Sequence, residues 1–383
     1  MKKKIKVLIL TSTYPPQHTG SGLLIDGINK RLEKDPSIEF LFKIYCLTTR
    51  KIPDSEEIPK NVIFVRTDLN NYFKFSGIKN FIIDSFKYDV LLVVTLVQPL
   101  ILISSVLAIL FKRKIILEHT LLEQNLPGMI RKIYKYLTYR YFFKYLKVYS
   151  TGLASQIKNY GFKGKVYNFG AQVDLERFYY DPENIAKRRK ELGISYSGEN
   201  CFTFVGALSY RKGIDRIFNL INNIHEEQDY FINIVGPETD YYKDISKKNS
   251  QLIEKLKKEG KLNIVLGKNN RVNDFLMCSN FFLFPTRNEG FGAVLIEAMA
   301  SGCIPISARV EGVTDDFLNS QNSFHFDFSD KTFFDTFLRA LNLSSIERKK
   351  LIKKCLEDVS YYSLERVSND YKSMYCEILN VRN

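Results

Sequence analysis

The sequence lacks the common motifs for zinc, dithiol and divalent-cation sites, and it also lacks the pattern of a signal peptide. Its six cysteines form no C-x-x-C pair, which argues against the common zinc and dithiol motifs and predicts reduced thiols in the cytosol. No D-x-D motif is present, so the usual carboxylate pair for a divalent cation is missing and we expect no metal site. Lys2, Lys3 and Lys4 lead directly into a short apolar run, and we therefore expect no signal peptide.

Length and composition indicate a globular protein of two domains. The chain has 383 residues, of which 45% are hydrophobic and 26% are charged. This composition excludes intrinsic disorder, and the length exceeds what one ordinary hydrophobic core holds together. We expect two domains of fewer than about 200 residues each.

The net positive charge of the chain lies entirely in its first half. Residues 1–172 contain 27 Lys and Arg against 12 Asp and Glu, a net charge of +15, whereas residues 173–383 contain 29 against 30. A field of this kind favours an anionic partner, either a nucleic acid or an anionic membrane surface. A basic surface without any partner is the alternative.

Apolar runs alternate with helix-length segments in both halves. Continuous apolar strands of this kind predict parallel sheets covered on both faces, and therefore an α/β protein of two consecutive Rossmann-like units. The expected strands are 5–11, 42–48, 61–67, 89–95 and 114–119 in the first half, and 201–207, 231–236, 263–267, 280–286 and 303–308 in the second.

Two segments admit a membrane interpretation. Residues 90–111 carry no charge over 22 residues, but a central Gln98-Pro99 pair favours a strand, a turn and a buried helix over a spanning helix. Residues 129–147 interleave basic and aromatic side chains at helical spacing. This helix either lies on an anionic membrane or packs its aromatic face into the domain, and the charge of the first half favours the membrane.

The stretch Phe284–Ser307, FPTRNEGFGAVLIEAMASGCIPIS, carries the strongest functional signal. Glu289 precedes a loop that contains Phe291 and Gly292, and Glu297 lies in the helix-forming run that follows. The junction of a loop and a helix offers free backbone N–H groups to a phosphate, while carboxylates accept hydrogen bonds from sugar hydroxyls. The pattern predicts a site for a nucleotide sugar. An exposed helix with two surface glutamates is the alternative.

Three further groups of candidate functional residues lie at or just after the ends of expected strands. Gly20 lies in the loop TSTYPPQHTGSG after the first strand, where glycine lets the backbone approach a diphosphate. Arg211 and Lys212 follow the first strand of the second half and suit a pyrophosphate. His119 ends a strand, where functional residues of open α/β sheets collect, although a structural histidine is the alternative.

These motifs resemble glycosyltransferase family 4 (glycosyltransferase group 1), whose retaining enzymes carry an E-x7-E signature close to PSxxEGFGxxxxEAMAxGxPVI. The first loop resembles the family's YPPxxGG, with Thr19 for the first glycine and Gly20 for the second. Ala207 stands where members often have a donor-binding arginine, and Arg211, adjacent to the matched Lys212, is expected to replace it. The matches run in the family's order from residue 5 to the C-terminus.

The resemblance implies a GT-B fold, with two Rossmann-like domains facing a cleft and a C-terminal helix crossing back to the first. The expected domains are 1–172 for the acceptor, 173–360 for the nucleotide-sugar donor, and the crossover helix 361–383. The implied catalytic residues are Glu289, His119, Arg211 and Lys212; the implied donor-binding residues are Gly20, Arg211, Lys212, Phe291, Gly292 and Glu297.

The resemblance also implies the activity, a retaining hexosyl transfer in which the nucleotide sugar is a co-substrate. We expect no cofactor and no metal, since Arg211 and Lys212 can neutralise the leaving diphosphate in place of a divalent cation. The basic first domain favours a glycan or lipid-linked acceptor at the inner face of the cell membrane, in cell-surface polysaccharide or glycolipid synthesis. We expect no nucleic-acid partner, because nucleic-acid binding does not account for the signature of residues 284–307. A nucleotide-sugar epimerase and a non-catalytic sugar-binding protein are the alternatives, and a nucleic-acid-binding protein would leave residues 284–307 unexplained.

Overall fold

The chain forms two compact units, residues 1–172 with 364–383 and residues 173–363. The structure is a computed structural model that describes residues 2–16, 20–48, 54, 57–66, 78–94, 114–120, 129–141, 143–224, 227–267 and 271–381. Each unit is built on one parallel sheet, so the predicted α/β class with two Rossmann-like units is confirmed.

The sheet of the N-terminal unit has the strand order β3-β2-β1-β4-β5-β6-β7. Its strands are β1 (Lys3–Thr11), β2 (Ile38–Thr48), β3 (Val62–Arg66), β4 (Val90–Val94), β5 (Lys114–His119), β6 (Tyr145–Val148) and β7 (Lys165–Asn168). All neighbouring pairs are parallel. Every residue of β4 is buried, as expected for a strand covered on both faces.

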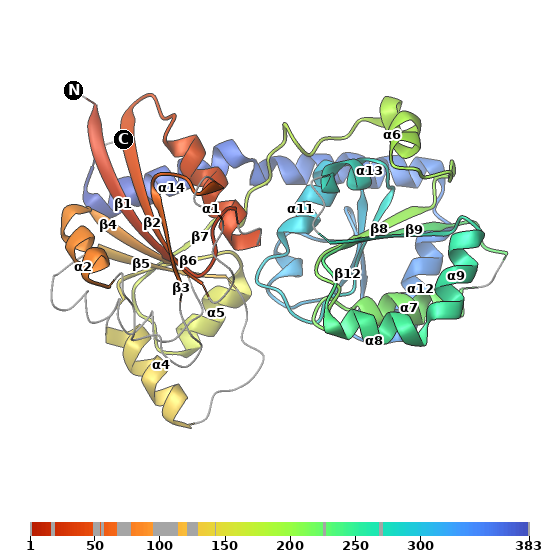
Figure 1. Ribbon diagram of the computed structural model, residues 1–383, viewed down its shortest axis with the longest axis horizontal. Coiled ribbons are helices and arrows are strands. Elements are labelled where there is room, and N and C mark those ends of the chain that lie inside the picture. Colours follow the sequence, from red (N-terminus) through yellow and green to blue (C-terminus); the bar gives the residue numbers. More distant parts are fainter. Residues whose placement is uncertain are drawn as a thin grey trace. The chain divides into compact units, whose positions relative to one another are not determined.

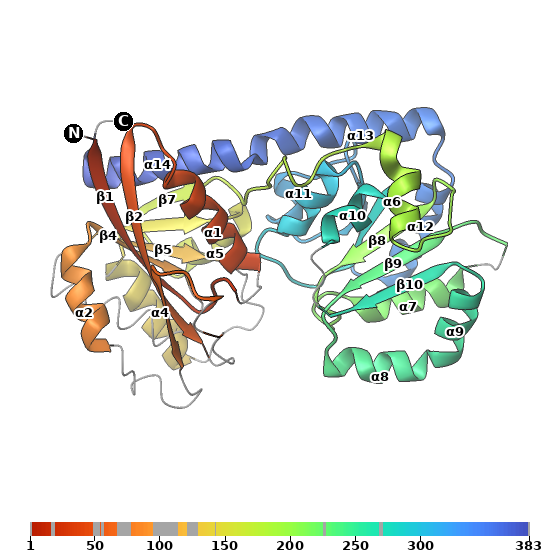
Figure 2. The same cartoon turned by 45° about the horizontal axis from the view of Figure 1, so that its top comes forward.

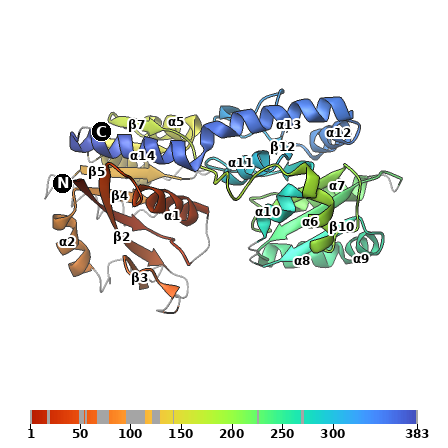
Figure 3. The same cartoon turned by 90° about the horizontal axis from the view of Figure 1, so that it is seen from above.

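Helices cover both faces of this sheet. They are α1 (Gly20–Leu32), α2 (Ile78–Lys87), α4 (Met129–Tyr141), α5 (Thr151–Asn159) and α14 (Leu364–Leu379). Helices α1 and α14 lie on one face, with α4 and α5 on the other (Figure 1). Although they are far apart in the sequence, α1 and α14 pack side by side (Figure 3). The C-terminal helix thus returns to the first unit, as the resemblance implied.

The sheet of the C-terminal unit has the order β10-β9-β8-β11-β12-β13. Its strands are β8 (Cys201–Val205), β9 (Phe231–Gly236), β10 (Leu262–Leu266), β11 (Phe281–Phe284), β12 (Ile304–Ala308) and β13 (Phe324–Phe326). Figure 2 shows β8, β9 and β10 side by side.

The helices of this unit are η2 (Pro182–Asn184), α6 (Ile185–Glu191), α7 (Ile214–Asn223), α8 (Asp240–Lys248), α9 (Ser250–Lys258), α10 (Val272–Met277), α11 (Ala293–Ala300), η3 (Thr314–Asp316), α12 (Asp330–Leu341), α13 (Ser345–Val359) and η4 (Ser360–Tyr362). Helix α7 packs with α12 on one face of the sheet, and α11 packs with α13 on the other (Figure 1). The core between them is rich in phenylalanine and isoleucine.

The structure corrects the interpretation of residues 129–147 as one helix. Helix α4 ends at Tyr141, and Tyr145–Val148 forms strand β6. The chain turns into the sheet because Leu146 and Lys147 are fully buried there, beside β5. Strands β6, β7 and β13, each of three or four residues, were not among the predicted strands.

The apolar stretch 90–111 begins with strand β4, as predicted, and its residues from 95 onward lie outside the described part of the chain. Among the helices that the structure describes, none has the length and apolar character needed to cross a bilayer. All six cysteines lie within the described residues, where they are buried and form no disulfide bond.

Candidate active site

The strand order places two motif-bearing loops next to each other. The chain leaves β8 toward β9 and β10, and leaves β11 toward β12 and β13, so the order of strands reverses between β8 and β11. Loop 206–213 follows β8, and loop 285–292 follows β11. Ligands of open α/β sheets bind at the carboxyl ends of the strands at such a reversal.

Backbone contacts hold these two loops together. Gly213 has a φ of +76°, and a Cβ atom there would lie 2.1 Å from the carbonyl oxygen of Pro285. The Arg287 N–H donates to the carbonyl oxygen of Arg211 at 2.8 Å. The Arg211 guanidinium in turn donates to the carbonyl oxygen of Asn288, also at 2.8 Å. Loops 206–213 and 285–292 are therefore packed tightly against each other, and their side chains project from the same place in the unit.

Three of the predicted site residues contact one another where these two loops pack together. Arg211 Nη1 donates to Glu289 Oε1 at 3.1 Å, and Lys212 Nζ donates to the same oxygen. The side chains of Glu289 and Lys212 are 10% and 14% exposed, whereas that of Arg211 is 41% exposed. Two cations thus share one carboxylate, and the cluster keeps an excess positive charge that is open to solvent through Arg211.

Thr286, which stands where the resembled family has serine, braces this cluster. Its buried hydroxyl lies 3.1 Å from the carbonyl oxygen of Arg211 and 3.4 Å from Glu289 Oε1. A hydroxyl at this position can therefore connect the loop of the cations to the loop of the carboxylate.

A second ion pair beside the cluster was not predicted. The Arg287 guanidinium forms a two-fold hydrogen bond with the carboxylate of Asp215, at 2.8 and 2.6 Å, and lies 3.8 Å from the ring centroid of Tyr210. Hydrogen bonding to Asp215 raises the pKa of Arg287. The sequence signal was an arginine inside the motif and an acid just after Gly213, but only the fold shows that they meet.

Helix α11 begins directly after the loop. Its N-cap, Gly292, has a φ of +84°, a left-handed conformation that glycine adopts without strain. The helix therefore points its free N–H groups toward the loop that carries Glu289 and Phe291.

Glu297, in the second turn of α11, is partly buried. Within the described residues, no side-chain hydrogen bond or ion pair reaches its carboxylate. Burial raises the pKa of Glu297 to about 7, against the opposing charge of Arg177. Such a carboxyl group is available to a ligand.

Gly20 and His119 belong to the N-terminal unit. Gly20 is the first residue of α1, with open space where a Cβ atom would lie. His119 is the last residue of β5 and is buried. Thr19, which stands for the first glycine of the resembled loop, lies outside the described residues.

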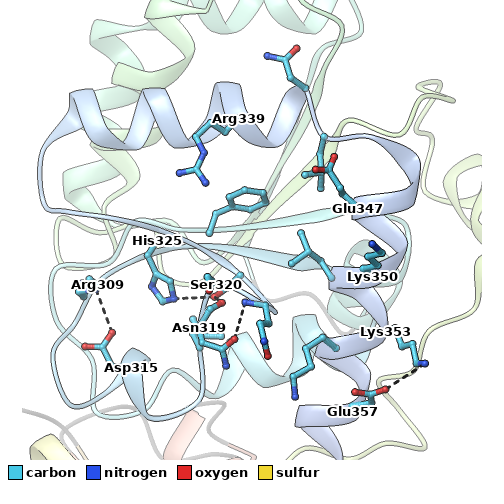
Figure 4. A pocket seen from close by; sticks show the side chains of 18 of the residues that line it. Arg309, Asp315, Asn319, Ser320, His325, Arg339, Glu347, Lys350, Lys353 and Glu357 are labelled. Carbon is cyan, nitrogen blue, oxygen red and sulfur yellow. Dashed lines mark hydrogen bonds and ion pairs between the residues drawn. The ribbon is translucent and has the colours of Figure 1, made fainter.

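The C-terminal unit also has an open groove of about 1500 Å³ elsewhere, over strand β13 (Figure 4). It is bordered by α12, α13 and the segment between β12 and β13, and residues of both charge signs line it, including Arg309, Asp315, Arg339 and Glu347. None of the predicted site residues lines this groove. The groove is therefore separate from the candidate active site, despite its size.

Comparison with known proteins agrees with the motifs. Residues 185–357, within the C-terminal unit, match the family described as Glycosyl transferases group 1. The N-acetyl-alpha-D-glucosaminyl L-malate synthase of Bacillus anthracis is 26% identical over 56% of this chain and 53% of its own length. The capsular polysaccharide biosynthesis glycosyltransferase CapH of Staphylococcus aureus is 30% identical over 46% of this chain and 48% of its own length. The chain thus spans about half the length of these relatives.

The fold agrees over nearly the whole chain. The crystal structure of Anabaena Alr3699/HepE in complex with UDP superposes with a TM-score of 0.78 at 14% identity, covering 97% of this chain and all of that one. This likeness shows the GT-B fold. The family match thus shows that residues 185–357 are similar to group 1 glycosyltransferases, and the curated relatives agree with this similarity.

Proposed function

We propose that the protein is a retaining glycosyltransferase that moves a sugar from a nucleotide-diphosphate sugar to a hydroxyl group of a glycan or lipid-linked acceptor. The observation that carries this proposal is the meeting of Arg211, Lys212 and Glu289 at the reversal point between β8 and β11. Cations beside free helical N–H groups suit a diphosphate, and the adjacent carboxylate suits the hydroxyl groups of the attached sugar.

In the proposed reaction, the bond between C1 of the sugar and the diphosphate breaks with its electron pair on the phosphate oxygen. A new bond forms from C1 to the acceptor oxygen on the same face of the ring, and the acceptor proton passes to the leaving phosphate. Arg211, Lys212 and the amides near Phe291 and Gly292 stabilise the charge that accumulates on the diphosphate. Glu289 positions the sugar and Glu297 accepts hydrogen bonds from the ribose.

The roles in the N-terminal unit follow from the resemblance. His119 is expected near the reacting sugar, and the loop leading to Gly20 near the donor phosphates and the acceptor. No metal is needed in this scheme, since the two cations neutralise the leaving group.

A screen of nucleotide sugars tests the proposal. A thermal-shift panel of UDP-, GDP-, ADP- and CDP-sugars should reveal one donor class that raises the Tm. Incubation of that donor with acceptors should then release free nucleoside diphosphate and form a glycoside with the donor's anomeric configuration. Release without a glycoside would contradict transfer, conversion of the sugar without an acceptor would favour an epimerase, and binding without turnover would favour a sugar-binding protein.

We propose that the acceptor is presented at an anionic membrane surface, in cell-surface polysaccharide or glycolipid synthesis. Helix α4 exposes Ile133, Tyr136, Leu137 and Tyr141 at helical spacing, in the unit with a net charge of +15 over residues 1–172. One helix face that exposes apolar side chains within a basic domain suits the boundary between headgroups and acyl chains.

Flotation with vesicles of phosphatidylglycerol and phosphatidylcholine tests this proposal. We expect binding at low salt that weakens with salt and is reduced in the double variant Ile133→Ser, Leu137→Ser. Ile346→Ser, at a residue of the C-terminal unit that is 70% exposed, is the matched control. Failure of the wild-type protein to float at low salt would rule the membrane out.

A further inference from the structure

The polypeptide passes between the two units twice, after Gln172 and after Ser363. These two connections are hydrogen-bonded to each other within the C-terminal unit. The Val173 N–H donates to the carbonyl oxygen of Tyr362 at 2.8 Å, and Val173 and Ser363 form a parallel bridge. A displacement of the backbone at one connection is therefore transmitted to the other through this hydrogen bond.

The second connection also contacts the candidate active site. The ring of Tyr362 lies 5.4 Å from that of Phe291 and 5.8 Å from that of Phe317, and the latter two rings stack at 4.9 Å. Phe291 and Phe317 are 5% and 8% exposed. We call Phe291, Phe317 and Tyr362 the aromatic triad. It contacts the site loop through Phe291.

Phe291 makes the triad relevant to the site. It lies two residues after Glu289 and directly before Gly292, the N-cap of α11. The first half of the loop is fixed by the bond from Arg211 to the carbonyl oxygen of Asn288. The second half of the loop joins helix α11 at Gly292, and a glycine leaves the backbone more freedom than any other residue. We therefore infer that the packing of Phe291 orients this half of the loop.

We propose that Tyr362 is a positioning residue for the site: it holds the Glu289–Gly292 loop through Phe291 and so couples nucleotide binding to the two chain connections. The coupling rests on the proposed function, whereas the positioning of the loop does not. A phosphate bound at the start of α11 would shift Phe291, and the shift would pass through Tyr362 to the backbone pair of Val173 and Ser363.

Hydrogen–deuterium exchange without ligand tests the positioning. Tyr362→Ala should speed the exchange of amides 289–295 at least several-fold, whereas Tyr362→Phe, which keeps the ring contacts, should leave it unchanged. Tyr196→Ala is the matched control, because Tyr196 is also partly buried and stacks on Phe231 at 5.7 Å in the same unit. Unchanged exchange of the loop in Tyr362→Ala would overturn the proposal.

Fluorescence tests the coupling. The sequence contains no tryptophan, so Tyr362→Trp and Tyr196→Trp each introduce a single tryptophan emitter. The nucleoside diphosphate of the panel UDP, GDP, ADP and CDP that stabilises the wild-type protein should shift the tryptophan emission of the Tyr362→Trp variant. The same nucleotide should leave the emission of the Tyr196→Trp variant unchanged. If calorimetry shows that the Tyr362→Trp variant binds the nucleotide while its emission stays unshifted, the coupling is overturned.

Kinetics separate positioning from simple loss of stability. Tyr362→Ala should lower kcat about ten- to a hundredfold, with a smaller effect on KM, because a displaced loop misplaces the reacting groups. Tyr362→Phe should restore kcat. If the wild-type protein binds no nucleotide, the proposed function and the coupling both fail, and the exchange experiment still decides whether Tyr362 holds the loop.

Discussion

Glu118 on β5 is the direct neighbour of Lys147 on β6 in the parallel register, and both side chains are fully buried. Tyr149 and Tyr371 donate hydrogen bonds to the Glu118 carboxylate, the second at 3.0 Å. Lys147 Nζ donates to the carbonyl oxygen of Gly170 at 3.2 Å and lies over the ring of Tyr149. Because Tyr371 belongs to α14, this charged cluster fastens the C-terminal helix to the first sheet.

The cluster predicts a pH dependence of stability. Burial lowers the pKa of Lys147 from 10.5 to about 7, and the charge of Glu118 opposes the shift. Between about pH 7 and 9 the unfolded chain keeps a proton that the folded chain has released, so the free energy of unfolding rises with pH. The slope from one proton is at most about 1.4 kcal/mol per pH unit.

Lys147→Met should flatten this dependence, which calorimetric Tm values at about pH 7 and 9 would reveal. Lys158→Met, at an exposed position of α5, is the control and should retain the wild-type slope. Equal slopes in the Lys147 variant and the wild type would show that another group is responsible.

The cation cluster predicts a loss of catalysis when either cation is removed. Lys212→Ala or Arg211→Ala should raise the barrier to transfer by about 2–4 kcal/mol, because each variant lacks a donor to the departing diphosphate. Initial rates with the donor from the screen would give kcat/KM. Lys247→Ala, on the exposed face of α8, should behave like the wild type. An unchanged rate in both cluster variants would place the diphosphate elsewhere.

The close packing of Gly213 predicts that a single methyl group disturbs the site. Gly213→Ala introduces both a strained φ and a clash with the carbonyl oxygen of Pro285. Gly193 has a similar φ of +70° with nothing within 4 Å, so Gly193→Ala reports the strain alone. We expect Gly213→Ala to lower the Tm more and to weaken nucleotide binding, measured by thermal shift. Similar effects of both substitutions would show that the loop of Pro285 moves away and relieves the clash at position 213.

Burial of Glu297 predicts pH-dependent donor binding. Its pKa of about 7 means that the carboxylate forms as the pH rises through neutrality. If the ionised form accepts hydrogen bonds from the ribose, affinity for the nucleoside diphosphate should increase by up to about tenfold per pH unit below that pKa. Calorimetric Kd values from about pH 5.5 to 8 would show this trend. Glu297→Gln should remove it, and a persisting trend would assign it to another group.

The amphipathic and apolar patterns were sufficient to predict both parallel sheets, because strands buried on both faces leave long apolar runs such as Val90–Val94. They did not reveal β13, since three residues are too few to form a pattern. They also misassigned Tyr145–Val148, because Lys147 reads as a surface residue until Glu118 is known to lie beside it.

By itself, the sequence determined where the candidate site residues lie along the chain: the basic turn at Arg211 and Lys212 and the glutamates of the 284–307 stretch are local patterns. Only the tertiary structure decided which of these residues meet. Glu289 contacts both cations, and Tyr362 contacts Phe291 from 71 residues further along the chain. The physical reason is that local composition governs strand and loop formation, whereas contacts between loops depend on the order of strands in the sheet.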